Sequence, residues 1–243
     1  MRLRLGRRSF LAGSVIAIAS FAGVLSTQLT YELQITRLRV DLGGRLAFVP
    51  DLHYHRPSEG HVRNLLEALD REDPDAVVLA GDVVDEETSD VESLGSVLSR
   101  IESDLKLAVL GNHDYWSGKA GEVASMLRGH GFRVLLDDLV ETPIGKVYGF
   151  DWREDRRYRP VMVDGIVIAH DPNAADSVSG NALVLAGHTH GGFSIGGLTL
   201  YSNSRYSRGL YELGSVRLYV SRGVGQMTHQ IRINSPPELL IVE

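Results

Sequence analysis

The chain contains no cysteine among its 243 residues, so it has neither disulfides nor thiolate ligands for a metal ion. Any metal site must therefore use oxygen and nitrogen ligands, which favours Mn, Fe, Zn or Mg over softer ions. The sequence also lacks low-complexity tracts, heptad runs and internal repeats. Hydrophobic residues make up 43% and charged residues 23%, as in an ordinary globular protein. The length allows one sizeable domain or two small ones.

Acidic residues are absent before Glu32, and the first 26 residues differ from the rest of the chain. Four arginines precede a modest apolar run over residues 10–25, a pattern typical of an export signal. The adjacent Arg7 and Arg8 resemble the twin-arginine type. We therefore predict a twin-arginine-type signal or N-terminal anchor over residues 1–26. The alternative is a true membrane helix, although the run is shorter than the roughly 20 residues usual for spanning. No clean cleavage site is evident.

The predicted signal implies export across the cytoplasmic membrane, with twin-arginine export machinery as a partner. The protein would then be periplasmic, in the cell wall or anchored facing outward, with membrane-surface association as a further expectation. Without residues 1–26, 21 Lys and Arg stand against 31 Asp and Glu, a net charge of about −10. A domain this acidic is a poor partner for nucleic acid, which is held through phosphate contacts.

Apolar runs alternate with helical patterns from Tyr31 onward. The runs predict buried strands over residues 45–49, 75–81, 105–111, 163–170 and 182–188. The helical patterns cover residues 61–72, 91–102 and 121–131, and the tail of the chain is rich in strands. No linker interrupts this order, so we predict one α/β domain over residues 31–243 with at least one mixed sheet.

Asp, His or Asn lies at or just beyond the end of each of the five predicted strands, and five of the nine histidines belong to this set. Singly, each of these residues has an ordinary explanation as a turn, a helix cap or a satisfied polar group. Ligands of open α/β sheets, however, bind beyond the carboxyl ends of the strands. Together the residues match two divalent ions roughly 3.5–4 Å apart that share a bridging carboxylate. The seven candidate ligands are Asp51, His53, Asp82, Asn112, His170, His188 and His190.

The ordered motifs DxH, GDxxD, GNHD, a lone His and GHTH resemble those of the calcineurin-like metallophosphoesterases. The segments GNHDYW, IAHDP, YVSRGVG and PPELLIV resemble an exported or membrane-associated bacterial branch of that superfamily. The resemblance implies a two-sheet mixed β-sandwich flanked by helices, a four-layer αββα fold. It places the site on the loops at one edge.

The resemblance also implies a role for each site residue. Asp82 would bridge two ions, with one ligand set on each side: Asp51, His53 and His190, and Asn112, His170 and His188. A hydroxide between the ions would attack the phosphorus. His113 would protonate the leaving oxygen or stabilise charge on the phosphoryl oxygens, and Asp114 would orient His113.

Four further residues lie close to these motifs. We expect Asp85 to support the metal ligands and His55 to be a solvated loop residue. Tyr115 and Trp116 either pack locally or form a hydrophobic lip for a lipid or glycan substrate, and the sequence leaves both possibilities open.

These features predict an exported phosphoesterase with two divalent ions (Mn, Fe or Zn). Its substrate would be a phosphodiester, pyrophosphate or phosphomonoester of envelope or extracellular origin, with lipid- or glycan-linked esters among the candidates. One alternative is a UDP-acylglucosamine-type pyrophosphatase of lipid A synthesis, whose cytoplasmic substrate conflicts with an export signal. The other is a non-catalytic metal-binding envelope protein, which the complete set of motif residues disfavours.

Overall fold

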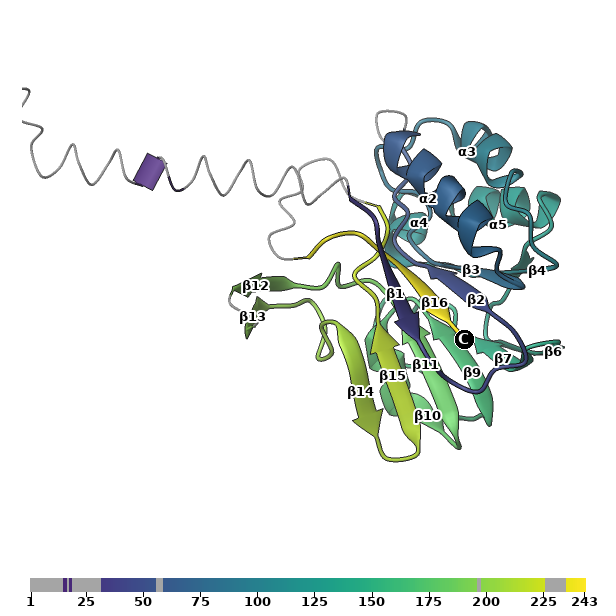
Figure 1. Ribbon diagram of the computed structural model, residues 1–243, viewed down its shortest axis with the longest axis vertical. Coiled ribbons are helices and arrows are strands. Elements are labelled where there is room, and N and C mark those ends of the chain that lie inside the picture. The colour runs from purple at the N-terminus through teal and green to yellow at the C-terminus, as the bar shows by residue number, and fades with distance from the viewer. Residues whose placement is uncertain (1–14, 17, 19–31, 56–58, 196–197, 226–234) are drawn as a thin grey trace, which may run out of the picture.

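The computed structural model describes residues 15–16, 18, 32–55, 59–195, 198–225 and 235–243. Two six-stranded mixed sheets stack on each other (Figure 1). The first sheet contains, in spatial order, β1 (Gln34–Leu38), β16 (Glu238–Val242), β2 (Leu46–Val49), β3 (Ala76–Ala80), β4 (Leu105–Val109) and β5 (Arg133–Val134). The second contains β14 (Gly209–Leu213), β15 (Val216–Val220), β11 (Ala182–Ala186), β9 (Gly165–Ala169), β7 (Gly145–Gly149) and β6 (Asp138–Thr142).

Three helices cover the outer face of the first sheet: α2 (Glu59–Glu72), α3 (Val91–Leu98) and α5 (Ala120–Gly129) (Figure 1). In α2 the apolar positions recur at helical spacing, and its inward side chains Val62, Leu65 and Leu69 are buried. Asp90 caps α3, because its side chain accepts a hydrogen bond from the Ser93 amide.

The outer face of the second sheet carries lighter cover. The 3-10 helix η2 (Pro172–Ser177) packs there, beside the short pair β8 (Val161–Met162) and β10 (Val178–Ser179). A further hairpin, β12 (Phe193–Ile195) and β13 (Leu198–Tyr201), projects from the sandwich (Figure 1). The predicted two-sheet α/β fold flanked by helices is confirmed, with its α-helices concentrated on one side.

Strand β3 illustrates why the runs are continuously apolar. Val77 and Leu79 point toward the helices, whereas Ala76, Val78 and Ala80 point into the core between the sheets. All five are buried, because a strand covered on both faces needs apolar residues at every position. The core between the sheets holds Phe48, one of the two largest fully buried side chains among the described residues.

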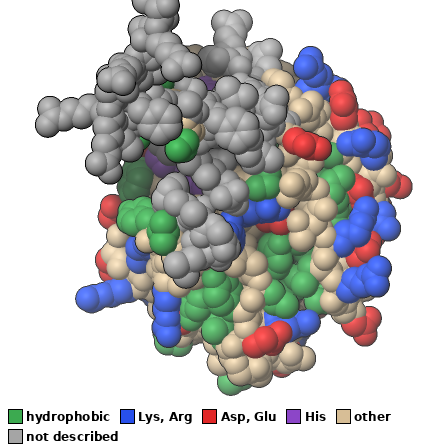
Figure 2. Space-filling model, turned by 60° about the vertical axis from the view of Figure 1, so that its left-hand side comes forward, with side chains coloured by type: hydrophobic (Ala, Val, Ile, Leu, Met, Phe, Trp, Pro, Cys, Tyr) green, Lys and Arg blue, Asp and Glu red, His purple; other side chains and the backbone are tan. Residues whose placement is uncertain are grey.

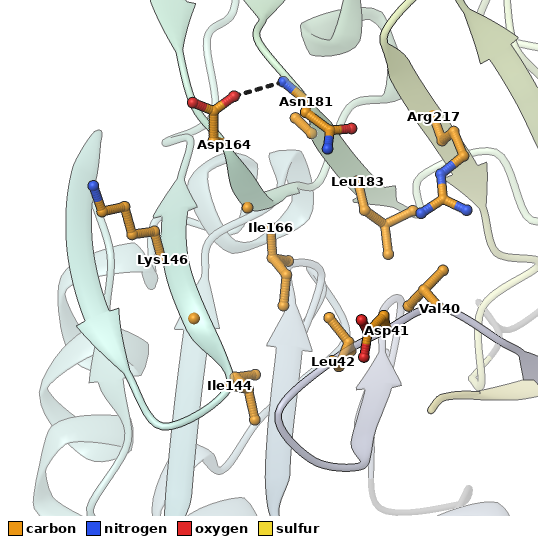
Figure 3. A pocket seen from close by; sticks show the side chains of 13 residues that line it. Val40, Asp41, Leu42, Ile144, Lys146, Asp164, Ile166, Asn181, Leu183 and Arg217 are labelled. Atoms are coloured by element: carbon orange, nitrogen blue, oxygen red, sulfur yellow. Dashed lines mark hydrogen bonds between the residues drawn. The ribbon is translucent and has the colours of Figure 1, made fainter.

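Strands β2, β3, β4 and β5 run parallel, as do β15, β11, β9 and β7. Their carboxyl ends therefore collect polar loops at one end of the sandwich. The opposite end has a pocket of about 350 Å³ where β7, β9 and β11 begin. Figure 3 shows its apolar floor, which includes Ile166 and Leu183, between Lys146 on one side and Arg217 on the other.

The five predicted buried strands and three helices are all present. The predicted helix over 91–102 is too long, since α3 ends at Leu98 and residues 99–100 form a turn. The edge strands β1, β6 and β14 were not predicted. Most of the predicted signal, residues 1–14, 17 and 19–26, lies outside the described residues. Within the described part of the chain, no helix has the length and apolarity needed to cross a membrane.

Candidate active site

Loops at the carboxyl ends of strands from both sheets bring the seven predicted metal ligands together. The first sheet supplies residues after β2, β3 and β4, and the second supplies residues after β9 and β11. Six of the seven are buried, and His190 is half-buried. His53 and His190 are 137 residues apart in sequence, yet their Nε2 atoms lie 3.2 Å apart. The candidate site therefore spans the junction between the two sheets.

The candidate ligands fall into two groups. In the first group, one ligand atom from each of Asp51, His53 and His190 lies within 4.8 Å of the others. Asp82, His170 and His188 form the second group in the same way. The Asn112 Oδ1 atom joins the second group at 2.9 Å from His170 Nε2, and His188 Nδ1 lies 3.2 Å from the same nitrogen.

Asp82 lies between the groups. Its Oδ2 atom is 3.1 Å from His170 Nε2 and 3.7 Å from His53 Nε2. Its Oδ1 atom accepts a hydrogen bond of 2.8 Å from the His113 amide, which fixes the carboxylate. One oxygen thus faces both groups at once, as a bridging ligand requires.

The donor set fits divalent metal ions. Neighbouring ligand atoms around an ion bonded at about 2.1 Å are separated by about 3.0–3.4 Å. The separations of 2.9 and 3.2 Å between His170 Nε2 and its two neighbours have this size. Imidazole, carboxylate and amide oxygen without sulfur are the ligands expected for Mn, Fe or Zn.

Unusual backbone conformations mark the same residues. Five of the seven have positive φ angles, a left-handed region that non-glycine residues rarely occupy. They are Asp51 (57°), His53 (44°), Asp82 (49°), His188 (71°) and His190 (49°). Such strain concentrates at functional sites, where the surrounding structure imposes it.

The glycines of the motifs allow the loops to approach one another closely. A Cβ atom on Gly187 would lie 2.5 Å from Pro50 Cβ and 2.6 Å from Asp51 Oδ2, so a larger residue would push against both the Pro50 ring and the Asp51 carboxylate. In the native loop, both Asp51 oxygens lie within hydrogen-bond distance of the His188 amide, at 3.0 and 3.1 Å. The GH pair of the last motif therefore positions a ligand of the first motif.

Neighbouring charges within the site strongly shift the pKa values of its residues. Burial alone would lower the pKa of His170, but the adjacent Asp82 carboxylate raises it to about 10. Burial alone would raise the pKa of Asp82, but the charge on His170 holds it well below its ordinary value. Burial and the charge on His170 together lower the pKa of His188 to about 3. In the metal-free protein, a proton on His170 thus provides positive charge beside Asp82.

The predicted catalytic pair is arranged differently from the expectation. His113 Nδ1 lies 2.8 Å from Glu86 Oε2, so Glu86 is the carboxylate that contacts this imidazole. Asp114 is fully buried and accepts hydrogen bonds from the amides of Gly111, Val83 and Val84 instead. Burial and the nearby Asp82 raise the pKa of Asp114 to about 7. The hydrogen bonds of the Asp114 carboxylate therefore join two loops, and the orienting role predicted for it remains a prediction.

Two further side chains contact candidate ligands, one expected from the sequence and one not. Asp85 Oδ2 lies 3.5 Å from His53 Nδ1, the supporting position expected for it. The Asn203 side chain contacts His188, with 3.2 Å between Asn203 Nδ2 and His188 Nε2, and this residue was missed. The prediction of a solvated His55 is wrong: it is only 8% exposed, because the loop packs against residues 83–88.

Two packed mixed sheets with carboxylate and imidazole groups gathered at one end define a class of metal-dependent hydrolases. Residues 44–192 match the model of the calcineurin-like phosphoesterase family. The chain is 34% identical over 205 residues to an uncharacterized metallophosphoesterase of Aquifex aeolicus, covering 76% of this chain and 78% of that protein. The chain therefore belongs to the calcineurin-like phosphoesterase family, and it is a metal-dependent phosphoric ester hydrolase.

Two longer relatives show the same similarity. The uncharacterized metallophosphoesterase Cj0846 of Campylobacter jejuni is 29% identical over 234 residues, covering 87% of this chain and 61% of that protein. A transmembrane protein with a metallophosphoesterase domain from Danio rerio is 25% identical over 272 residues, covering 96% and 62%. The chain thus spans less than two thirds of each of these two relatives.

Proposed function

We propose that the protein binds two divalent ions at once and uses them to hydrolyse a phosphate ester of envelope or extracellular origin. The observation that carries the proposal is the position of Asp82 Oδ2 between the two ligand groups, 3.1 Å from His170 Nε2 and 3.7 Å from His53 Nε2. Asp51, His53 and His190 would hold one ion, and Asn112, His170 and His188 the other. A phosphodiester or pyrophosphate is favoured over a monoester as substrate.

Divalent ions at such a site polarise the phosphoryl group, neutralise its developing charge and activate water near neutral pH. The remaining chemistry belongs to the chain. Because Glu86 contacts Nδ1 of His113, Nε2 is the nitrogen available to the ester. His113 would donate the Nε2 proton to the leaving oxygen, while Glu86 stabilises the imidazolium. The His53 ring, 5.1 Å from the His113 ring, links this acid to the first ligand group.

Hydrolysis and metal content test the proposal together. The full chain loaded with Mn²⁺ should contain two ions by elemental analysis and should cleave bis(p-nitrophenyl) phosphate faster than p-nitrophenyl phosphate. Asp82→Asn should lose metal and most activity, because the shared ligand loses its charge. His130→Ala is the matched control, since His130 lies at the end of α5 away from the site. One ion per chain, or an unchanged rate in Asp82→Asn, would refute the proposal.

We further propose that the protein works outside the cytoplasmic membrane. Support comes from the basic and apolar residues 1–26 and from the similarity to a relative described as transmembrane. Replacing Arg7 and Arg8 by lysine should leave the protein in the cytoplasmic fraction, whereas the same change at Arg2 and Arg4 should not. Export of the first double variant would contradict the twin-arginine route.

A further inference from the structure

Trp116 is a large hydrophobic side chain that remains 51% exposed at the end of α4 (Asn112–Trp116), three residues after His113. Its indole ring lies 5.1 Å from the His113 imidazole and 6.3 Å from the Trp152 indole, edge-to-face in both cases. The proposed general acid therefore lies directly against an exposed aromatic surface. The function proposed above gives a role to His113 of the GNHDYW motif but none to Trp116.

Hydrogen bonds fix the two indole rings. Glu154 Oε2 accepts from Nε1 of Trp116 at 2.9 Å and from Nε1 of Trp152 at 3.3 Å. Trp152 is buried, and its ring lies 5.4 Å from that of His188 and 5.9 Å from that of His170. We call Trp116 and Trp152 the indole wall. It runs from solvent to the second ligand group, and its rigidity lowers the entropy lost when a ligand binds.

The position of the indole wall indicates which part of a substrate it contacts. His113 is the residue proposed to protonate the leaving oxygen, so a group next to His113 belongs to the leaving side of the ester. We propose that the indole wall is a binding subsite for a flat ring, of aryl or nucleobase type, in the leaving group. This inference rests on the proposed function and adds a substrate class to it.

The charges around the indole wall favour a ring over a lipid. Glu86 contacts His113 and Glu154 contacts Trp116, and both carboxylates are exposed, so they would repel an anionic membrane surface. Tyr115 adds no free hydroxyl, since its OH donates to Asp151 Oδ1 at 2.7 Å. An uncharged ring that stacks on the exposed indole avoids this repulsion and gains aromatic contact.

Three phosphonates test the subsite without being hydrolysed. Phenylphosphonate and hexylphosphonate each carry six carbons, as a flat ring or a flexible chain, and methylphosphonate carries one. Isothermal titration calorimetry on the Mn²⁺-loaded full chain should show phenylphosphonate binding about tenfold more tightly than methylphosphonate, the size of one stacking contact. Hexylphosphonate should gain less. Because the chain has only two tryptophans, both in the indole wall, phenylphosphonate should also change the intrinsic fluorescence.

Variants separate stacking from a general loss of structure. Trp116→Phe should keep most of the preference for phenyl over methyl, and Trp116→Ala should reduce it to about one. Met162→Ala is the matched control, because Met162 is an exposed apolar residue on β8, and it should keep the full preference. Equal binding of hexyl- and phenylphosphonate would overturn the proposal in favour of a lipid chain. A preference that survives in Trp116→Ala would overturn it as well.

These experiments distinguish failure of the subsite proposal from failure of the proposed function. Ring preference without any ester hydrolysis would refute the hydrolytic proposal and leave the subsite supported. Hydrolysis of bis(p-nitrophenyl) phosphate without ring preference would do the reverse.

Discussion

Metal binding should release a proton and should strengthen with pH, because His170 is protonated in the metal-free protein. The Asp82 carboxylate, 3.1 Å from Nε2, raises the pKa of His170 to about 10 against the effect of burial. His170 Nδ1 lies 3.0 Å from the carbonyl of Ala80, so the proton on Nε2 is the one that occupies the ligand position. An ion can bind Nε2 only after that proton has left.

The competition of one proton with one ion sets the size of the effect. At pH 7 the His170 imidazole lies below its raised pKa, so its proton competes with the ion for the same nitrogen and weakens metal binding. Apparent affinity should therefore rise by about tenfold per pH unit between pH 6.5 and 8.5. The raised pKa has the opposite effect on the metal-free fold. Its contribution to stability is complete below about pH 6.5 and is lost as the pH rises toward 10.

Calorimetry in buffers of different ionisation enthalpy measures the protons released per ion. We expect about one from His170 at pH 7, with an additional contribution from His53, whose pKa is also raised by its acidic neighbours despite burial. The control variant His130→Ala should behave like the native protein. An affinity that stays constant from pH 6.5 to 8.5, with no proton released, would refute this account of the site's electrostatics.

Three other changes have defined outcomes. Glu238→Gln should lower the free energy of unfolding by about 2–4 kcal/mol in urea denaturation, since it removes a buried carboxylate partner of Arg222. Because the pKa of Glu238 is lowered despite burial, that difference should shrink below pH 4.5; a constant difference would contradict it. Gly187→Ala should weaken metal affinity on the order of 10–100-fold by displacing Asp51, and unchanged affinity in a metal titration would count against the close approach. Glu86→Gln should reduce kcat on the order of tenfold with little change in metal content, and an unaltered kcat would remove its role.

The central strands were predictable because burial on both faces leaves a continuous apolar run. Strand β3 shows this in AVVLA, where every residue is buried. The edge strand β1 was not predictable in the same way, since QITRL is partly exposed and carries polar residues. Helix α3 was predicted too long because the register of apolar residues continues to Ile101, although the last α-helical residue is Leu98.

The convergence of the candidate ligands was predictable from their place after parallel strands, where several chain segments must meet. The contacts behind them were not. Glu86 belongs to an acidic run in which only the backbone conformation decides which carboxylate reaches His113. Asn203 follows β13 in a loop without a motif, and its contact with His188 depends on how that loop folds back. Trp152 likewise reaches the site only through the loop after β7.

The candidate ligands come from both sheets, and this has a consequence for the stability of the protein. Each ion would act as a non-covalent cross-link between halves of the chain that lie far apart in sequence, as His53 and His190 do. Such a cross-link resists separation of the sheets only while ions are present, so thermal tolerance would follow the metal supply. Without the ion the folded chain would unfold more readily. A low metal supply would then shorten the lifetime of the protein as well as slow its reaction.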